Sequence, residues 1–296
     1  MIPAGFAYAA PSTTEAVLAL LAERPDEIKL MAGGQSLIPL LRLRLACPDI
    51  LVDLRHLAEL RAVDDLGHAF RVGAMVTHRD VIDSEAARAW QIVHDGGADL
   101  ADPLVRNRGT FGGSIAHADP AGDWPPIALA LNATMHVRSL HGTRTVAADE
   151  FFTDLFTTAI DESELLTHIE FAKSAAGDRS AYVKIPHPAS GYAVAGAGVV
   201  LSVVDGVCRG ARIVLTGVAS GPVRARAVED ALLGQEITAG VLARAAGWAA
   251  EGIGFIGDSY APEEYRRNLA GVAVRRALQR AVSPNVPDHH QREHRG

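Results

Sequence analysis

In the N-terminal part of the chain, segments with helical spacing of apolar residues alternate with short apolar runs typical of strands. The segment PSTTEAVLALLAER spaces its valine and leucines three and four apart, after the hydroxyl residues Ser12 and Thr13 that can cap a helix. The short apolar runs IKLMAG and ILVDL are typical of strands, and LRLRL between them alternates leucine with arginine. This mixture predicts a small α+β lobe.

The middle of the chain repeats the mixture and predicts a second lobe. FRVGAMVTHRDVID indicates a strand, a turn at Gly73 and a helix that begins near Thr77. IALALNA indicates a further helix. TMHVRSLHGTRTV predicts a strand pair turned at His141-Gly142, and ELLTHIEF predicts another strand.

The C-terminal part changes to long Val, Ile and Ala strands followed by helices. The strands are expected in YAVAGAGVVLSVV and CRGARIVLTGVA, and the helices in VRARAVEDALLG and PEEYRRNLAGVAVRRALQRA. KSAAGDRS, before this region, is the most loop-like connection in the chain. We therefore expect one domain at 1–175, with lobes at about 1–56 and 57–175, a second domain at 176–282, and a flexible tail at 283–296.

Composition and charge narrow the possible partners. The chain has 296 residues and a net charge of -7, from 28 Lys and Arg against 35 Asp and Glu, so it repels nucleic acid and anionic membranes. The N-terminus lacks a basic region before an apolar run, and the longest apolar stretch falls short of the roughly 20 residues that span a bilayer. We expect a soluble cytoplasmic protein without an integral membrane segment.

The two cysteines exclude some metal chemistry for this chain. Cys47 and Cys208 lie far apart and show no metal-ligand spacing, so we expect neither a zinc site nor an iron–sulfur cluster here. His117 with Asp119 is only half of a metal site, because no third ligand follows at a workable spacing. The histidines of the tail are those of a solvated segment. We expect no metal ligand in the chain.

Two glycine-rich elements are the strongest chemical signal. They are Gly33-Gly34-Gln35-Ser36 and Thr110-Phe111-Gly112-Gly113-Ser114, each with a glycine pair beside a hydroxyl residue. Glycine permits positive φ angles, with which successive backbone N–H groups can converge on an anion, and it lets the anion approach closely. One such element is most often only a turn. Two of them suit a diphosphate held from both sides, and neither matches a dinucleotide fingerprint or a P-loop.

Three segments together identify a family resemblance. AGGQSLIPLLRLRLACPDILVDLR, LADPLVRNRGTFGGSIAHADPAGDWPPIALALNA and PEEYRRNLAGVAVRRALQRA resemble the FAD-binding medium subunit of the molybdenum hydroxylases, the xanthine dehydrogenase family, in the three-subunit form of aerobic carbon monoxide dehydrogenase. The resemblance runs from Ile2 to about Ala281. It implies an α+β fold: a two-lobed FAD-binding domain of the vanillyl-alcohol-oxidase (PCMH) type, then a C-terminal α+β domain of sheet plus helices.

The resemblance also implies how the two loops bind FAD. The first loop, from Ala32 to Ser36, would bind the pyrophosphate with backbone N–H groups and the Ser36 hydroxyl, and the second loop would face it. Many family members have His where this chain has Gln35, whose amide can still donate a hydrogen bond. The implied cofactor-binding residues in and near the loops are Ala32, Gly33, Gly34, Gln35, Ser36, Leu37, Leu100, Thr110, Gly112, Gly113, Ser114 and Ala116.

Four further positions match family residues near the cofactor. Asp123 matches an acidic residue at the ribose or ribityl region, but it could equally cap the following helix. Leu166 matches a residue that packs on the isoalloxazine ring, although by itself it indicates core. Lys184 matches a lysine near the flavin, where a cation favours reduced, anionic flavin; the alternative is a snorkelling surface lysine. Tyr192 matches a tyrosine against the ring, whereas unaided it would be a buried core residue.

The resemblance implies an electron-transfer role in an oxidoreductase complex. A large subunit would hold the molybdenum cofactor, a small subunit two [2Fe-2S] clusters, and FAD in this chain would pass electrons to an external acceptor, within a dimer of heterotrimers. No catalytic acid or base is then required, and Ser190 with His187 lacks a hydrolase motif. Two alternatives stay open: a free-standing flavin oxidoreductase of the same FAD fold, and a non-enzymatic phosphate-binding or assembly protein.

Overall fold

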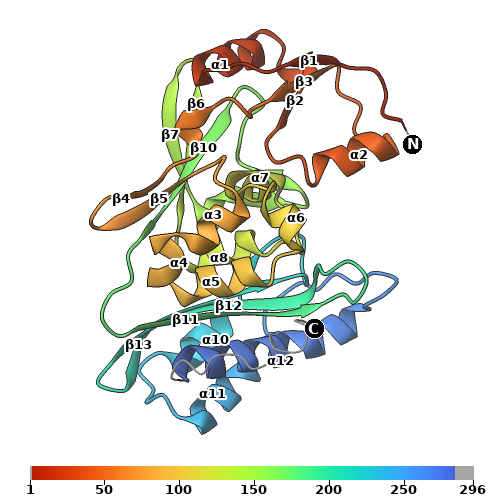
Figure 1. Cartoon of the computed structure of the whole chain (residues 1–296). Helices are drawn as coiled ribbons and strands as arrows, with labels where there is room; N and C mark the ends of the chain where they lie inside the picture. The colour runs from red at the N-terminus through yellow and green to blue at the C-terminus, as the bar shows by residue number, and fades with distance from the viewer. Residues whose placement is uncertain (1, 284–296) are drawn as a thin grey trace, which may run out of the picture.

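Three sheets of three or more strands follow one another from the N-terminal to the C-terminal end of the structure (Figure 1). The structure is a computed structural model that describes residues 2–283. Apart from Ser283, the predicted tail therefore lies outside the described residues. Helices lie between the second and third sheets and below the third. The predicted mixture of helices and strands is confirmed.

The first sheet is parallel and small. Its strand order is β1-β3-β2, and Val17, Leu18 and Leu21 of the first helix are buried beside it. Thr13 caps that helix by accepting the backbone N–H of Ala16, so one of the two predicted caps is used. The second helix follows the first glycine loop and was not predicted. The elements are β1 (Ala7–Ala9), α1 (Thr14–Glu23), β2 (Ile28–Met31), α2 (Leu37–Leu43) and β3 (Ile50–Asp53), with a 3-10 turn at Pro25–Glu27.

The second sheet is antiparallel, with strand order β4-β5-β10-β6-β7. Its side chains alternate, so that Met135 and Ile169 enter the core while His136 and His168 lie on the other face. The predicted β6–β7 turn is off by one residue, because Ser139 pairs with Gly142 and leaves Leu140 and His141 as the turn. The strands are β4 (Val63–Asp65), β5 (Ala69–Gly73), β6 (Thr134–Ser139), β7 (Gly142–Ala147) and β10 (Leu165–Ala172).

Short helices occupy the space between the second and third sheets (Figure 1). As predicted, Thr77 begins the first of them, since its side chain accepts the backbone N–H of Asp80. The helices are α3 (His78–Asp83), α4 (Glu85–Ala89), α5 (Gln91–Ala98), α6 (Pro103–Arg106), α7 (Phe111–His117), α8 (Trp124–Ala130) and α9 (Ala148–Phe151). A 3-10 turn at Ala58–Leu60 and the hairpin of β8 (Phe152–Asp154) and β9 (Thr157–Thr158) complete this part.

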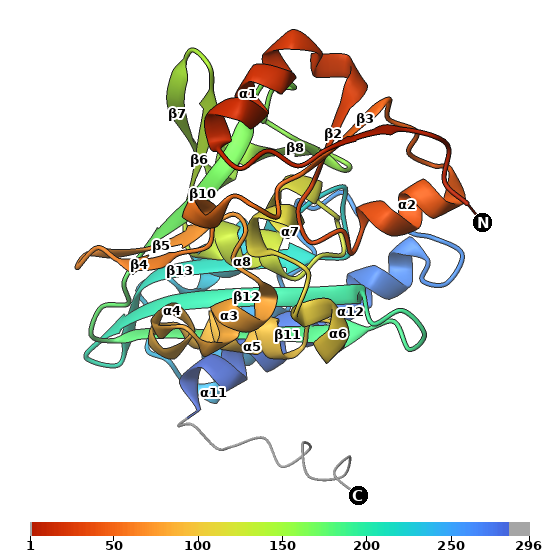
Figure 2. The same cartoon turned by 45° about the horizontal axis from the view of Figure 1, so that its top comes forward.

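The third sheet lies between two layers of helices, as Figures 1 and 2 show. Its antiparallel strands β11-β12-β13-β14 contact α5 and α8 on one face and α10 and α12 on the other. Tyr182, Val200 and Val214 therefore join the core of the preceding part, while their strand neighbours face α12. The elements are β11 (Asp178–Pro186), β12 (Ala193–Val204), β13 (Val207–Thr216), β14 (Val223–Arg224), α10 (Arg226–Leu232), α11 (Ala239–Ala246), which was not predicted, and α12 (Glu263–Val282).

Burial on both faces explains the composition of β12. A strand covered on one side alternates apolar and polar residues, whereas β12 is apolar almost throughout. Among residues 2–283, no helix is both long and apolar enough to cross a membrane.

Candidate functional site

The two glycine-rich loops contact each other. A Cβ placed on Gly33 would lie 2.2 Å from the carbonyl oxygen of Arg108 and 2.6 Å from Cα of Gly109, just before the second loop. A Cβ placed on Gly113 would lie 3.4 Å from Cβ of Ala32. The structure therefore brings together two segments that are far apart in the sequence, and at Gly33 the contact leaves room only for glycine.

The first loop offers free backbone donors. Within residues 2–283, none of the N–H groups from Gly33 to Ser36 donates a hydrogen bond to a protein acceptor. Gly34 has φ of +76°, which turns the chain between β2 and α2. Gln35 is exposed, and its Nε2 donates to the carbonyl oxygen of Gly33 at 3.4 Å. Ser36 precedes α2 without using its hydroxyl as a cap, so that hydroxyl is also available to an anion.

The second loop differs from the prediction, because its N–H groups are already used. Phe111 donates to the carbonyl oxygen of Val76 at 2.9 Å, Gly112 to that of Ala74 at 3.1 Å, and Gly113 to Oγ1 of Thr110 at 3.1 Å. The first two bonds tie the start of α7 to the segment after β5, and in the third Thr110 acts as the N-cap of α7. This loop does not present convergent N–H groups.

The structural reason for a glycine at position 112 also differs from the prediction. Gly112 does not have a positive φ angle. Its helical position brings it against β5, and a Cβ placed there would lie 2.5 Å from Cα of Ala74. Close packing, rather than an unusual backbone angle, therefore requires glycine at this position. The neighbouring Ser114 lies half-buried in the first turn of α7.

The remaining loop-associated residues lie in different surroundings. Leu37 begins α2 and is half-buried, Ala116 is exposed on α7, and Leu100 is buried after α5. Leu166 is buried in β10 within the main apolar core, as its sequence context by itself indicates. Protein atoms therefore already cover most of the Leu166 and Leu100 side chains.

Asp123 and Lys184 form a buried ion pair. The Nζ of Lys184 donates to Oδ2 of Asp123 at 3.0 Å, and the two side chains are only 4% and 9% exposed, respectively. Lys184 Nζ also donates to the backbone carbonyl of Asp99 at 2.8 Å. Lys184 has the partner that its strand position requires, and the snorkelling alternative is wrong. Asp123 precedes α8 but makes no side-chain cap, so the capping alternative is wrong as well.

Tyr182 is a third member of this group that sequence reasoning missed. It is fully buried, and its hydroxyl donates to Oδ1 of Asp123 at 2.7 Å. Burial raises the pKa of Asp123, while the Lys184 charge and the Tyr182 hydrogen bond oppose that rise. Burial and the nearby Asp123 carboxylate raise the pKa of Tyr182 well above its usual range. Nothing in the sequence distinguishes Tyr182 from an ordinary core tyrosine.

Tyr192 is 47% exposed, so the expectation of a buried core tyrosine is wrong. Partial burial raises the pKa of Tyr192, and the negative charges of Asp119 and Asp123 add to this effect. The strand that follows is tied to the segment before Asp123, because Ala193 N donates to the Ala121 carbonyl at 3.4 Å. Thr216 Oγ1 donates to the carbonyls of the same segment. The third sheet thus holds an exposed aromatic ring beside the Asp123 group.

A buried histidine supports the second loop from beneath. His78 Nδ1 accepts the indole N–H of Trp124 at 2.9 Å, and a Cβ placed on Gly109 would lie 2.6 Å from His78 Nε2. Burial, with a smaller contribution from the Arg106 charge, lowers the pKa of His78 to about 4. His78 is therefore neutral at pH 7, as an acceptor at Nδ1 must be. This role is another that the sequence did not reveal.

The arrangement fits a flavin dinucleotide chemically. Free N–H groups and a free hydroxyl in the first loop suit a pyrophosphate, since anions bind where backbone donors converge. The glycines leave no Cβ between the loops. Lys184 adds a fixed cation and Tyr192 an exposed ring, the kind of surface on which a flat conjugated system packs.

Two family models match the chain in succession. Residues 4–173 match the FAD binding domain in molybdopterin dehydrogenase, and residues 180–281 match the CO dehydrogenase flavoprotein C-terminal domain. The fold and the two matches define the class as FAD-dependent flavoproteins of molybdopterin dehydrogenases. The predicted fold class and the FAD cofactor are confirmed.

Individual relatives agree with this class over nearly the whole chain. The carbon monoxide dehydrogenase medium chain of Afipia carboxidovorans is 36% identical, over 95% of this chain and 98% of its own length. The nicotine 6-hydroxylase medium subunit of Paenarthrobacter nicotinovorans is 34% identical, over 92% of this chain and 95% of its own length. A solved structure of carbon monoxide dehydrogenase from Hydrogenophaga pseudoflava matches with a TM-score of 0.91 and 38% identity, over 95% of this chain and 98% of that chain. That enzyme is described as lacking the Mo-pyranopterin moiety of the molybdenum cofactor. The chain belongs to the FAD-binding medium subunits of the molybdenum hydroxylases, which are oxidoreductases, as the resemblance predicts.

Proposed function

We propose that this chain is the electron-transfer subunit of a molybdenum hydroxylase complex. In this proposal, a large subunit holds the molybdenum cofactor, a small subunit holds two [2Fe-2S] clusters, and two such heterotrimers form the complex. FAD, when bound, supplies the chemistry of accepting electrons from the clusters and releasing them to an external acceptor. The medium subunits named above are parts of complexes that act on carbon monoxide and on nicotine, which supports this division of labour.

The free donors of the first loop carry the proposal. The N–H groups from Gly33 to Ser36 and the hydroxyls of Ser36 and Ser114 would bind the pyrophosphate, while α7 supports the opposite side. The proposed cofactor-binding residues are Ala32, Gly33, Gly34, Gln35, Ser36, Leu37, Leu100, Thr110, Gly112, Gly113, Ser114, Ala116, Asp123, Leu166, Lys184 and Tyr192. We propose the domain division at residue 175, which lies between the two matched ranges.

Lys184 would supply a fixed positive charge to the site. Its Nζ is held in place by Asp123 and the Asp99 carbonyl, so its charge cannot swing into solvent. A fixed cation favours negative charge on a neighbouring group. Lys184→Met should therefore retain FAD and shift its midpoint potential to more negative values, whereas an unchanged potential would remove Lys184 from this role.

Any iron–sulfur cluster that supplies electrons to this chain would be held by another chain. Cys47 and Cys208 are the only cysteines, and an iron–sulfur cluster of the usual kind takes four cysteine ligands. Both are free thiols, which supports a reducing, cytoplasmic location as part of the proposal.

Purification from the native host tests the assembly. A tagged chain should bring down two further subunits together with FAD, iron and molybdenum, and substrate should bleach the flavin absorption of this complex. If the chain emerges alone, fully loaded with flavin and turning over a substrate, the free-standing oxidoreductase is correct instead.

Flavin titration of the isolated chain tests the loop. Ser36→Ala removes the free hydroxyl and should weaken FAD binding about tenfold, the effect of one hydrogen bond to a charged group. Ser12→Ala, on an exposed residue away from the loops, is the matched control. A chain that binds no FAD would overturn the assignment of the site, and equal affinities of the two variants would remove Ser36 from it.

A further inference from the structure

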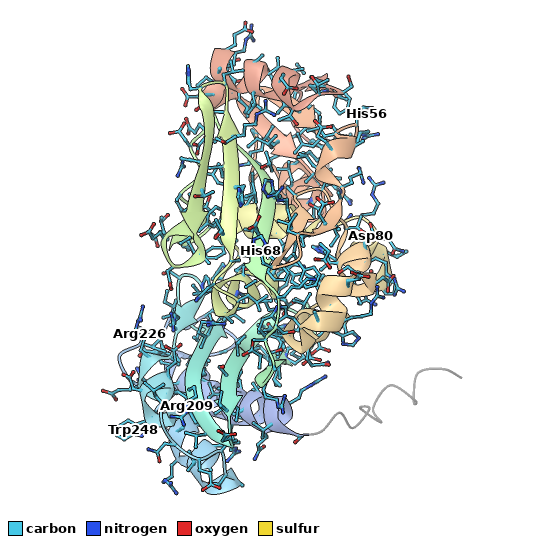
Figure 3. The ribbon with its side chains drawn as sticks, turned by 90° about the vertical axis from the view of Figure 1, so that its left-hand side faces the viewer. His56, His68, Asp80, Arg209, Arg226 and Trp248 are labelled. Atoms are coloured by element: carbon cyan, nitrogen blue, oxygen red, sulfur yellow. The ribbon has the colours of Figure 1, made fainter. Side chains whose placement is uncertain are left out.

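Two histidines and a glutamate gather on the outer face of the five-stranded sheet. His136 on β6 pairs directly with His168 on β10, and their rings stack with centroids 4.0 Å apart and planes 22° apart. Glu170 lies two residues after His168 and therefore shares its face. One ligand atom from each residue lies within 4.8 Å of the other two. Figure 3 views the molecule from the side on which this sheet lies in Figure 1.

Thr167 fixes the tautomer of His168. The Thr167 hydroxyl donates its single proton to the backbone carbonyl of His136 at 3.0 Å, because a carbonyl can only accept. The contact of 3.0 Å between Thr167 Oγ1 and His168 Nδ1 must then have Nδ1 as the donor. The irregular register between Leu166 and His168 places this hydroxyl beside the ring. His168 therefore carries its proton on Nδ1 and a bare lone pair on Nε2.

That lone pair has no partner in the protein. Within residues 2–283, His168 Nε2 is the one side-chain nitrogen or oxygen that is buried without any hydrogen bond. Burying an acceptor without a donor costs about 1–3 kcal/mol, so such groups are rare. A histidine with Nδ1–H held by a neighbour and Nε2 free has the arrangement in which proteins present histidine to a metal ion.

Neighbouring charges leave the cluster able to bind a cation. Arg71 donates to Oε2 of Glu170 at 3.2 Å, and among residues 2–283 no hydrogen bond reaches Oε1. The carboxylate can thus keep Arg71 and still offer an oxygen.

We propose that His136, His168 and Glu170 bind one Zn²⁺ ion, with a fourth position open to water. Two imidazoles and a carboxylate are a preferred set of protein ligands for this ion, whereas Mg²⁺ and Ca²⁺ prefer oxygen. Zinc bonds of about 2.0–2.1 Å place tetrahedral ligand atoms about 3.4 Å apart. The three ligand atoms lie within 4.8 Å of one another, and His136 Nε2 is 3.8 Å from Oε2 of Glu170, so the stacked rings must turn toward the ion and the side chains must close by up to about 1.4 Å. The site shares no residue with the proposed FAD site.

Zinc titration of the full-length chain tests the site. The tail histidines could bind zinc independently, so every protein in the test carries His289→Gln, His290→Gln and His294→Gln. After treatment with a chelator, calorimetry with zinc chloride should give one ion per chain, and Mg²⁺ should give none. His136→Gln, His168→Gln and Glu170→Gln should each weaken binding at least tenfold, and Thr167→Val about tenfold through loss of the tautomer control.

A matched control and a spectroscopic signal separate binding from folding. His68→Gln changes an exposed histidine in the β4–β5 turn of the same sheet, labelled in Figure 3, and should bind zinc like the parent. Cobalt(II) should give the parent a visible absorption typical of tetrahedral nitrogen and oxygen ligands, and this band should be absent from each ligand variant that retains its circular dichroism. No zinc binding by the parent, or parental affinity in the folded ligand variants, would overturn the proposal.

Discussion

Lys184 Nζ lies 3.0 Å from the Asp123 carboxylate in a site that water barely reaches. Each charge is buried because the other is there, and Tyr182 adds a hydrogen bond to the carboxylate. The positive charge proposed to face the flavin is therefore one half of a pair that the third sheet and the segment before α8 build together.

Lys184→Met should destabilise the protein in a pH-dependent way. Without the Lys184 charge, which opposes the effect of burial on the carboxyl group, the pKa of Asp123 rises further. A carboxyl group whose folded pKa exceeds its unfolded pKa contributes stability at low pH and loses it as the pH rises. Urea unfolding should show a loss of about 3–5 kcal/mol at pH 8 and a smaller one at pH 5. Adding Asp123→Asn should recover most of the stability at pH 8, and an equal loss at both pH values would contradict this account.

Gly33→Ala should disturb the contact between the glycine loops. The new Cβ would meet the Arg108 carbonyl at 2.2 Å, and backbone on both sides must move to accept it. We expect a loss of about 1–3 kcal/mol in the free energy of unfolding and weaker FAD retention. Gly5→Ala is the control, because nothing lies within 4 Å of its Cβ position. Thermal unfolding with and without FAD measures both effects, and equal melting temperatures would argue against close packing here.

His78 should make the protein less stable in mild acid. Its folded pKa of about 4 lies below the ordinary value of 6.5, so the unfolded chain binds more protons between these pH values. Stability from this residue is fully present above pH 6.5 and is lost as the pH falls toward 4, by up to about 3 kcal/mol. His78→Gln can still accept the Trp124 indole N–H but does not titrate. Its unfolding free energy should therefore vary less than the parent's between pH 7 and pH 4.5, and an identical pH dependence would show that other groups are responsible.

Asp95 should couple α5 to both β11 and α12. Its buried carboxylate accepts the backbone N–H of Tyr182 at 3.2 Å and Nη2 of Arg280 at 2.8 Å. Asp95→Ala should cost about 3 kcal/mol, because the Tyr182 N–H loses its acceptor in the core. Arg280→Gln, at a side chain 41% exposed, should cost less, because Gln91 Nε2 and the Tyr182 N–H still donate to the buried carboxylate. Denaturant titration measures both variants, and equal losses would contradict the assigned importance of burial.

The sequence predicts most of the strands and long helices because their patterns are local. Helix α1 follows its hydroxyl cap, and β12 is apolar because both of its faces are covered. Helix α2 was missed because Pro39 and the alternation of leucine with arginine obscure a helix of one to two turns. The packing of Gly33 against Arg108 joins residues distant in sequence, so local patterns cannot show it.

The sequence placed the two glycine loops on one site, and the structure shows their contact, whereas the hydrogen bonds around them were not predicted. The pairing of the glycine loops follows from their composition, but only the fold shows that α7 uses the N–H groups of the second loop. Tyr182 and His78 look like ordinary core residues because their partners, Asp123 and Trp124, come from other segments. The His136 and His168 pair was likewise hidden until β6 and β10 aligned.

The third sheet completes a core whose helices are synthesised before it. Tyr182, Val200 and Val214 close the core beneath α5 and α8, yet the ribosome makes them after all the helices they cover. A chain released near residue 175 would keep an open apolar face beneath α5 and α8. Folding of the preceding part would therefore be completed only after these strands are made, and truncated products would be left to chaperones and proteases.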